Sequence, residues 1–230
     1  MRNNRKIICF SVLPLLLAAG CAPKAVVSDD LLSETQKNAA SQYEIALSYY
    51  DGNGVSKDYA EAFELFSKSA EQGNAQAQNS LGEMYYKGHG VKKDYAKALE
   101  LFAKSAEQGN AQAEKNLGDM SYYGEGVKED KAKAVSYYAQ AAGQSYAAAQ
   151  NSLGEMYMKG EGVKQDYSKA FVLFIEASEQ GDADAQNNLG DMYYNGLGVK
   201  TDKAKARQWY EKAAGQGHDL AKLSLKNFSL

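Results

Sequence analysis

A short glycine-rich motif recurs along this chain of 230 residues at a constant interval. From Gly52 to Gly88 the interval is 36 residues, and it stays the same through five copies without an insertion. The copies read Gly52-Asn53-Gly54-Val55, Gly88-His89-Gly90-Val91, Gly124-Glu125-Gly126-Val127, Gly160-Glu161-Gly162-Val163 and Gly196-Leu197-Gly198-Val199. A fixed period of this size is typical of a solenoid, in which each repeat packs only on its neighbours.

Two apolar patterns with helical spacing lie inside each repeat. In the second copy they contain Ala77, Leu81, Met84 and Tyr85, followed by Tyr95, Ala98, Leu99, Phe102 and Ala106. The similarity between copies is greater at twice the period, because residues 81–95 and 153–167 differ at only three positions. This indicates that a two-repeat unit was duplicated.

Polar residues and glycines mark where these helices begin and end. Asp94 precedes the second helix and is expected to accept hydrogen bonds from its first-turn amides. Gly109 follows that helix where a left-handed residue is favoured, and Asn110 is expected to cap the next first helix. Gly82 and Gly118 remove bulk from the contact stripe and are expected to let the paired helices approach closely.

These patterns together predict an all-α fold. The expected architecture is a right-handed α-solenoid of five 36-residue helix-turn-helix repeats over residues 39–230. Ala221 and Leu225 continue the register of a sixth first helix, which we expect to cap the C-terminal end.

The first twenty residues have the layout of a secretory signal. A short basic region is followed by the apolar run Ile7–Leu17, which is too short to span a bilayer as a mature helix. Small residues then precede Cys21, and this ending resembles the lipobox of bacterial lipoproteins. The resemblance implies cleavage before Cys21, a lipid-anchored residue 21 and a flexible tether over residues 21–38. Ala22 in place of aspartate favours sorting to the outer membrane.

Charge and cysteine content narrow the functional classes. The net charge of the whole chain is −3, and loss of three basic residues with the signal makes it about −6, which gives no electrostatic basis for binding nucleic acid. Cys9 would leave with the signal and Cys21 would be acylated, so no thiol remains for catalysis or for a metal. We therefore expect no metal and no cofactor.

The repeat pattern resembles the Sel1-like repeat family, a relative of the tetratricopeptide repeats. The shared pattern places alanine, Leu-Gly, tyrosine, Gly-x-Gly-Val, aspartate and further alanines in one register over residues 41–217. Ser121 replaces a tyrosine in the third copy, and Ser145 replaces the glycine between repeats, with Gly143 two residues earlier. The family resemblance implies a protein-binding solenoid.

Signals for catalysis are weak. The Gly-x-Gly-Val motif lacks the third glycine and the Lys-Ser/Thr pair of phosphate loops, so we interpret it as an inter-helix turn that needs positive φ. His89 is expected in a solvated loop, and His218 has no obvious partner. Some cysteine-rich relatives act on β-lactams, but this chain lacks their cysteines. We predict a non-enzymatic protein with no catalytic residues, and a β-lactamase-like hydrolase is the least favoured alternative.

The first helices carry a second face beside the core stripe. Tyr49, Tyr85, Tyr157 and Tyr193 belong to the core stripe and are expected to pack. The second face, by resemblance to tetratricopeptide repeats, lines the concave surface and is predicted to bind a partner protein. It comprises Asn79, Glu83, Tyr86, Lys115, Asp119, Tyr122, Asn151, Glu155, Met158, Asn187, Asp191 and Tyr194.

Two roles are compatible with a lipid-anchored binding solenoid at the bacterial cell envelope. Some lipoproteins with such repeats neutralise lipase-type toxins that rival bacteria inject, which implies an immunity protein. The alternative is an adaptor for cell-wall or secretion machinery. Both roles need a partner protein and a membrane attachment through Cys21.

Overall fold

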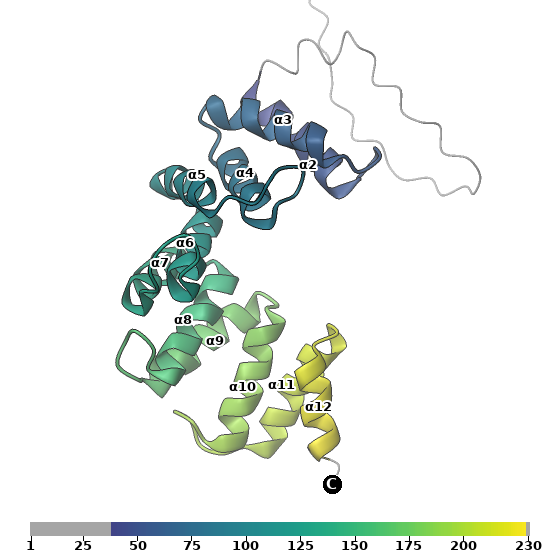
Figure 1. Ribbon diagram of the computed structural model, residues 1–230. Coiled ribbons are helices and arrows are strands. Elements are labelled where there is room, and N and C mark those ends of the chain that lie inside the picture. Colours follow the sequence, from purple (N-terminus) through teal and green to yellow (C-terminus); the bar gives the residue numbers. More distant parts are fainter. Residues whose placement is uncertain (1–37, 229–230) are drawn as a thin grey trace, which may run out of the picture.

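The computed structural model describes residues 38–228, and within them it contains helices and no strands (Figure 1). The predicted all-α solenoid is confirmed. Helix pairs follow one another along a curved path, from the α2–α3 pair at one end to α12 at the other. The predicted signal peptide, Cys21 and nearly all of the tether lie outside the described residues.

Ten helices of 13 residues form five pairs, and a shorter helix follows them. The first helices of the pairs are α2 (Ala39–Asp51), α4 (Ala75–Lys87), α6 (Ala111–Tyr123), α8 (Ala147–Lys159) and α10 (Ala183–Asn195). The second helices are α3 (Tyr59–Glu71), α5 (Tyr95–Glu107), α7 (Lys131–Gly143), α9 (Tyr167–Glu179) and α11 (Lys203–Gly215). The last helix is α12 (Asp219–Phe228).

The helix starts follow the predicted capping. The Asp94 carboxylate accepts from the amide of Lys97 at 3.1 Å, and the Asn110 side chain accepts from Ala113 at 3.1 Å. Tyr146 stands at the corresponding position before α8 and makes no side-chain cap. Helix α8, the first helix of the fourth repeat, therefore begins without the side-chain N-cap hydrogen bond that the first helices of the other pairs have.

The glycine motif forms the predicted turns. The first glycine ends each first helix in the left-handed region, with φ of +77° at Gly88. The second glycine faces the preceding repeat, because a Cβ atom at Gly90 would lie 2.5 Å from the carbonyl oxygen of Tyr59. Ser145 takes the glycine position between α7 and α8 at φ +60°, a conformation that non-glycine residues adopt at a cost.

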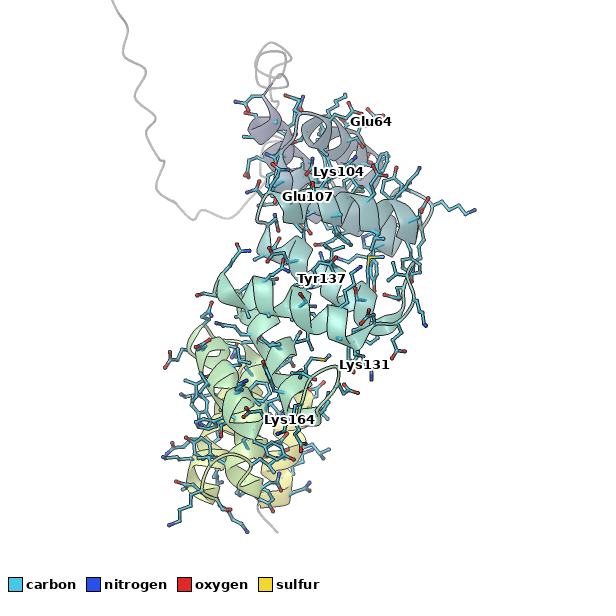
Figure 2. All side chains as sticks on the ribbon, turned by 90° about the vertical axis from the view of Figure 1, so that its left-hand side faces the viewer. Glu64, Lys104, Glu107, Lys131, Tyr137 and Lys164 are labelled. Carbon is cyan, nitrogen blue, oxygen red and sulfur yellow. The ribbon has the colours of Figure 1, made fainter. Side chains whose placement is uncertain are left out.

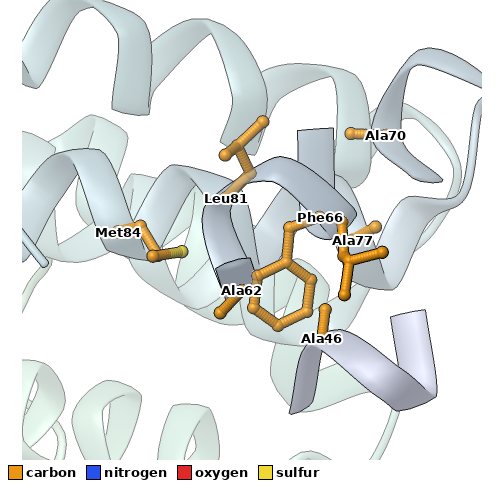
Figure 3. Close-up of a cluster of buried hydrophobic side chains, with 8 residues drawn as sticks. Ala46, Ala62, Phe66, Ala70, Ala77, Leu81 and Met84 are labelled. Carbon is orange, nitrogen blue, oxygen red and sulfur yellow. The ribbon is translucent and has the colours of Figure 1, made fainter. Parts of the chain in front are cut away.

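Paired helices touch at the predicted glycines. A Cβ atom at Gly118 would lie 2.5 Å from the Tyr138 ring, and one at Gly82 would lie 2.8 Å from the Phe102 ring. Figure 3 shows the first pair, where Ala46 takes the glycine position beside the Phe66 ring. In the later pairs the aromatic ring of the second helix occupies the space that the missing side chain leaves.

The two sets of helices form the two faces of the array. Side chains of successive first helices bond directly, as Asn116 on α6 does with Asn79 on α4. Successive second helices are further apart, and a cleft of about 450 Å³ separates α3 from α5 above Leu81. The first helices therefore line the inner, concave face. Figure 2 shows labelled side chains of the outer helices α3, α5 and α7.

Candidate functional site

Three of the predicted binding residues are buried. Asn79, Asn151 and Asn187 expose only 2%, 7% and 7% of their surface, so they offer a partner little area for direct contact. The following first helix covers them: the Asn79 Oδ1 atom accepts from the Asn116 amide at 3.0 Å. Their own amides donate to Glu83, Glu155 and Asp191 at 3.2, 3.2 and 3.4 Å. These buried asparagines therefore fix the position of the acidic side chain one turn later in the same helix.

The four acidic residues of the predicted face are half-buried and have two kinds of partner. Glu83 and Glu155 pair with Lys87 and Lys159, one turn later, at 2.6 and 2.7 Å. The second helices of these repeats carry Phe102 and Phe174.

Asp119 and Asp191 accept instead from a tyrosine of the second helix, Tyr138 at 2.8 Å and Tyr210 at 2.6 Å. Burial raises the pKa of both phenols, and the neighbouring aspartate raises it further. Burial also raises the pKa of the Asp191 carboxyl. The shorter aspartate leaves room for the hydroxyl, so Asp occurs with Tyr and Glu with Phe in alternate repeats. This alternation accounts for the greater sequence similarity between repeats that lie 72 residues, or two periods, apart.

Residues at the turns tie each repeat to the preceding one, and we call these sets junction contacts. Glu161, between two glycines, accepts from Tyr122 at 2.7 Å and pairs with Lys131 at 2.7 Å. Both partners lower the pKa of the Glu161 carboxyl. At the preceding junction Glu125 accepts from Tyr86 and Tyr95.

The other two junction contacts keep the same positions with different chemistry. His89 accepts from or donates to the Tyr50 hydroxyl at 3.0 Å and stacks on the Tyr59 ring at 4.7 Å. His89 thus lies in the predicted turn, half-buried and held by two tyrosines of the preceding repeat. At the last junction Leu197 packs with Met158 and Tyr167 in one apolar cluster. Junction chemistry thus explains why the residue between the glycines varies so much.

A groove at the centre of the concave face brings several predicted residues together. Its cavity of about 200 Å³ is lined by α6, α7, α8 and the turn after α8. The predicted residues Lys115, Asp119, Tyr122 and Glu155 all line it. The charges are paired with each other, Lys115 with Asp119 at 2.6 Å and Lys159 with Glu155 at 2.7 Å. The groove is therefore nearly neutral, with aromatic walls.

Tyr123 is the main residue of this groove that the sequence analysis missed. It exposes 67% of its surface and meets Tyr122 edge-on, with ring centroids 4.9 Å apart. Lysines occupy the corresponding positions 87 and 159. In α6 the acid pairs with Lys115, one turn before Asp119, and not with a lysine one turn after it. Position 123 is therefore not needed for the ion pair and carries an aromatic residue. The available signal was that Tyr123 is aromatic at a position that carries Asp51, Lys87, Lys159 and Asn195 in the other copies.

The remaining predicted residues lie on the same face at other repeats. Glu83 and Tyr86 line a cavity of about 200 Å³ between α4 and α6. Asp191 and Tyr194 line another of about 260 Å³ beside α12, and the Tyr194 ring contacts Phe228 at 5.2 Å. Met158 lies partly buried in the last junction contact. The residues of the predicted stripe thus line a series of small cavities along the concave face.

Among residues 38–228 no group of three His, Cys, Asp or Glu side chains is placed to hold a metal ion. In the same part of the chain, none of the helices has both the length and the apolar character needed to cross a bilayer.

Comparison with known proteins identifies the repeats. The model of the Sel1 repeat matches residues 39–74, 75–110, 111–146, 147–182 and 183–218. A Sel1 repeat protein from Oxalobacter formigenes is similar at 37% identity and a TM-score of 0.77, over 85% of this chain and 78% of that one. A protective antigen of uropathogenic Escherichia coli, c5321, is similar at 36% identity and a TM-score of 0.72 over 81% of this chain. This chain spans 40% of that protein's length.

A third solved structure comes from Pseudomonas aeruginosa. The immunity protein Pa5087 is 26% identical with a TM-score of 0.58, over 80% of this chain and 67% of that one. None of the curated proteins matches the sequence. Sel1 repeats typically serve as scaffolds for protein interaction, and five of them in one register account for the described solenoid. The chain belongs to the Sel1 repeat family.

Proposed function

We propose that this chain is a non-enzymatic immunity protein, anchored to the outer membrane through a lipid on Cys21 and facing the periplasm. In this role it binds a secreted lipase-type toxin in its concave face and blocks it. The similarity to the immunity protein Pa5087 over most of the chain supports the role. The lipobox-like residues before Cys21 support the anchor.

The central groove is the observation on which the binding role rests. Tyr122 and Tyr123 stand together at the middle of the array, and an exposed tyrosine offers a large contact area with little conformational entropy to lose. Hot spots of protein interfaces are rich in tyrosine and lie near the centre of the contact. The paired charges around the two rings form a polar rim that is already satisfied within the protein.

The acidic residues of the concave face fit binding better than catalysis. Asp119 is held by a lysine and a tyrosine, and Glu161 by the same two types of residue. General acid–base catalysis needs a group that is free to exchange a proton with a substrate. In the proposed role these carboxylates fix the groove and guide a partner by charge.

A toxicity assay tests the proposal. A candidate secreted lipase-type toxin is directed to the periplasm of a host that produces either this chain or a variant. Wild type is expected to restore growth. The double variant Tyr122→Ala/Tyr123→Ala is expected to fail although it reaches the same level. Val172→Ala on α9, also exposed but on an outer helix, should protect fully.

Binding measured by calorimetry for affinity and by stopped-flow kinetics for association rate separates the contributions. Loss of Tyr122 is expected to weaken binding by about 2 kcal/mol or more if it is a hot spot. Asp119→Asn should mainly slow association and reduce its dependence on salt. If wild type neither protects nor binds the toxin, the immunity role is wrong. Binding to cell-wall or secretion proteins would then favour the adaptor role.

A further inference from the structure

Two cavities of the concave face are equivalent in the repeat register, 72 residues apart. One is the central groove, and its lining includes Asp119, Tyr122, Tyr138 and Ser152. The other has a volume of about 260 Å³ and lies among α10, α11 and α12 (Figure 1), where its lining includes the equivalent residues Asp191, Tyr194, Tyr210 and Ser224. Helix α12 closes this second cavity as α8 closes the groove. A difference in their chemistry can therefore be traced to single residues.

The acid is the same in both cavities, but its partners differ. In the groove the Asp119 Oδ2 atom pairs with the Lys115 ammonium at 2.6 Å. The residue that corresponds to Lys115 in the second cavity is Asn187, whose amide nitrogen lies 3.4 Å from the Asp191 Oδ2 atom. A neutral amide thus stands where the groove has its cation. Asn195, one turn after the acid, is neutral as well.

Asp191 is the exception among the four acids of the concave face. Glu83, Asp119 and Glu155 each pair with a lysine of their own helix. Within residues 38–228 Asp191 forms no ion pair, and it is the only charged residue among those that line its cavity. Burial raises the pKa of its carboxyl, and the charge of His218 lowers that pKa less than burial raises it. The carboxylate is therefore only partly compensated.

Asn187 provides independent evidence for a missing donor. Its Oδ1 atom accepts no hydrogen bond, and it is the only buried side-chain oxygen or nitrogen among residues 38–228 without a partner. The equivalent oxygens of Asn79 and Asn151 accept from an asparagine of the next first helix. Ser224 stands at that position in α12 and bonds with Tyr210 instead. A positively charged donor would satisfy both this oxygen and the nearby carboxylate.

The walls of the cavity favour an organic cation over a metal ion. The rings of Tyr194, Tyr210 and Phe228 line it, and Phe228 meets both tyrosines edge-on at 5.2 and 5.8 Å. Aromatic rings attract ammonium and guanidinium groups, and Lys203 already lies over the Tyr194 ring at 5.4 Å. A calcium ion needs about six oxygen ligands or more, which one carboxylate among rings does not provide.

The cavity is also large enough for such a group. Its volume of about 260 Å³ is several times the roughly 30 Å³ that one water molecule occupies in the liquid. An ammonium or guanidinium group can therefore enter together with part of its alkyl stem. The rings that line the cavity offer that stem an apolar contact.

We propose that the cavity beside α12 binds one organic cation, the ammonium or guanidinium group of a lysine or arginine side chain on the partner protein. The cation pairs with Asp191, as Lys115 does with Asp119 in the central groove, and donates to the Asn187 Oδ1 atom. This rests on the proposed function only in taking the partner to be a protein. Such a partner presents an apolar surface to the central groove and a basic residue two repeats further along.

Nuclear magnetic resonance titration with defined probes tests the proposal. The Cys21→Ser protein, which cannot be acylated, is labelled with nitrogen-15, and the side-chain amide signals of Asn195 and Asn227 are followed. The cationic probes are acetyl-arginine methylamide and acetyl-lysine methylamide. Acetyl-norleucine methylamide has a similar stem without the charge. Both cationic probes are expected to shift these signals to saturation at one site, and the norleucine probe is expected to leave them unchanged.

Variants of the two equivalent cavities provide matched controls. Asn187→Lys supplies the cation that the groove already has, so it should abolish probe binding while circular dichroism shows an unchanged fold. Asp191→Asn should weaken binding about tenfold or more, because it removes a charge-assisted hydrogen bond. Lys115→Asn is the reverse exchange. It removes the cation beside Asp119 and should create a second probe site in the groove.

The outcomes are separable from those of the toxicity assay, because no toxin is needed. Absence of binding to wild type, equal binding of the norleucine probe, or binding that survives Asn187→Lys each overturns the cation site. A free diamine, 1,5-diaminopentane, distinguishes the source of the cation. If it binds more tightly than the lysine probe, the assignment to a protein side chain is wrong.

Discussion

At the scale of single residues, the concave face depends on which second-helix ring lies beside each acid. Asp119 and Asp191 accept from tyrosine hydroxyls, and Asp119 also pairs with Lys115, whereas Glu83 and Glu155 pair with lysines and no tyrosine. The sequence alone showed the periodic acids but not their partners. The partner of Asp119 lies 19 residues away on another helix, and only the packing of α6 on α7 brings it close.

These buried phenols should make the protein sensitive to alkali. The pKa of Tyr138 and of Tyr210 is raised in the folded state, while an unfolded tyrosine ionises near pH 10. A raised pKa contributes stability that is present below pH 10 and is lost as the pH rises above it. The free energy of unfolding, measured by urea titration from pH 8 to 11, is therefore expected to fall steeply above pH 10.

The double variant Tyr138→Phe/Tyr210→Phe should show a weaker dependence over the same range. At neutral pH it should lose about 1 kcal/mol for each hydrogen bond removed. Tyr123→Phe, at an exposed ring, serves as the control and should keep the wild-type profile. An equally steep fall in the double variant would mean that other groups govern alkaline unfolding.

At the scale of helices, most boundaries could be predicted because capping residues and glycines are local signals. Asp94, Asn110 and Gly109 act as expected. The errors concern residues whose surroundings come from the next repeat. The sequence predicts a surface position for Asn79 and a solvated turn for His89, yet each bonds with a residue more than 30 positions away in the chain. A pattern within one helix contains no information about what covers it.

The helix pairs should not tolerate bulk at their contact points. Gly118→Leu would insert a side chain into the Tyr138 ring and is expected to cost on the order of 1–3 kcal/mol or more. Thermal unfolding followed by circular dichroism should show a lower Tm with the helical signal retained at low temperature.

Gly143, at the end of α7, is the matched position for comparison. An added Cβ atom there meets no atom within 4 Å. Gly143→Ala should therefore leave the free energy of unfolding unchanged or raise it by up to about 1 kcal/mol, and the Tm should stay the same or rise accordingly. An unchanged Tm in Gly118→Leu would show that the paired helices can separate without loss.

At the scale of the whole molecule, the concave face presents two cavities with separate chemistry. The central groove has an exposed aromatic pair on α6, and the cavity beside α12 has Asp191 where the groove has the Lys115–Asp119 pair. The family pattern was sufficient to predict the solenoid. The position of the central groove depends on where the third repeat departs from that pattern, which a consensus cannot reveal.

Attachment to the membrane can be tested directly. If Cys21 carries the lipid, wild type should incorporate labelled palmitate, whereas Cys21→Ala should not be acylated or processed as a lipoprotein. Gel electrophoresis with autoradiography measures both. Equal labelling of the two proteins would rule out Cys21 as the anchor.

The junction contacts also have a consequence for how such a gene can gain and lose repeats by recombination. Deletion of residues 111–146 would bring Tyr86 and Tyr95 against Glu161, which keeps two hydroxyl donors with a carboxylate. Deletion of residues 147–182 would set Lys131 and Tyr122 against Leu197 and leave the lysine without its acceptor. We expect the first product to fold and the second to be less stable. The first, however, lacks Tyr122 and Tyr123, so a shortened allele could be inherited as an intact solenoid that no longer recognises its partner.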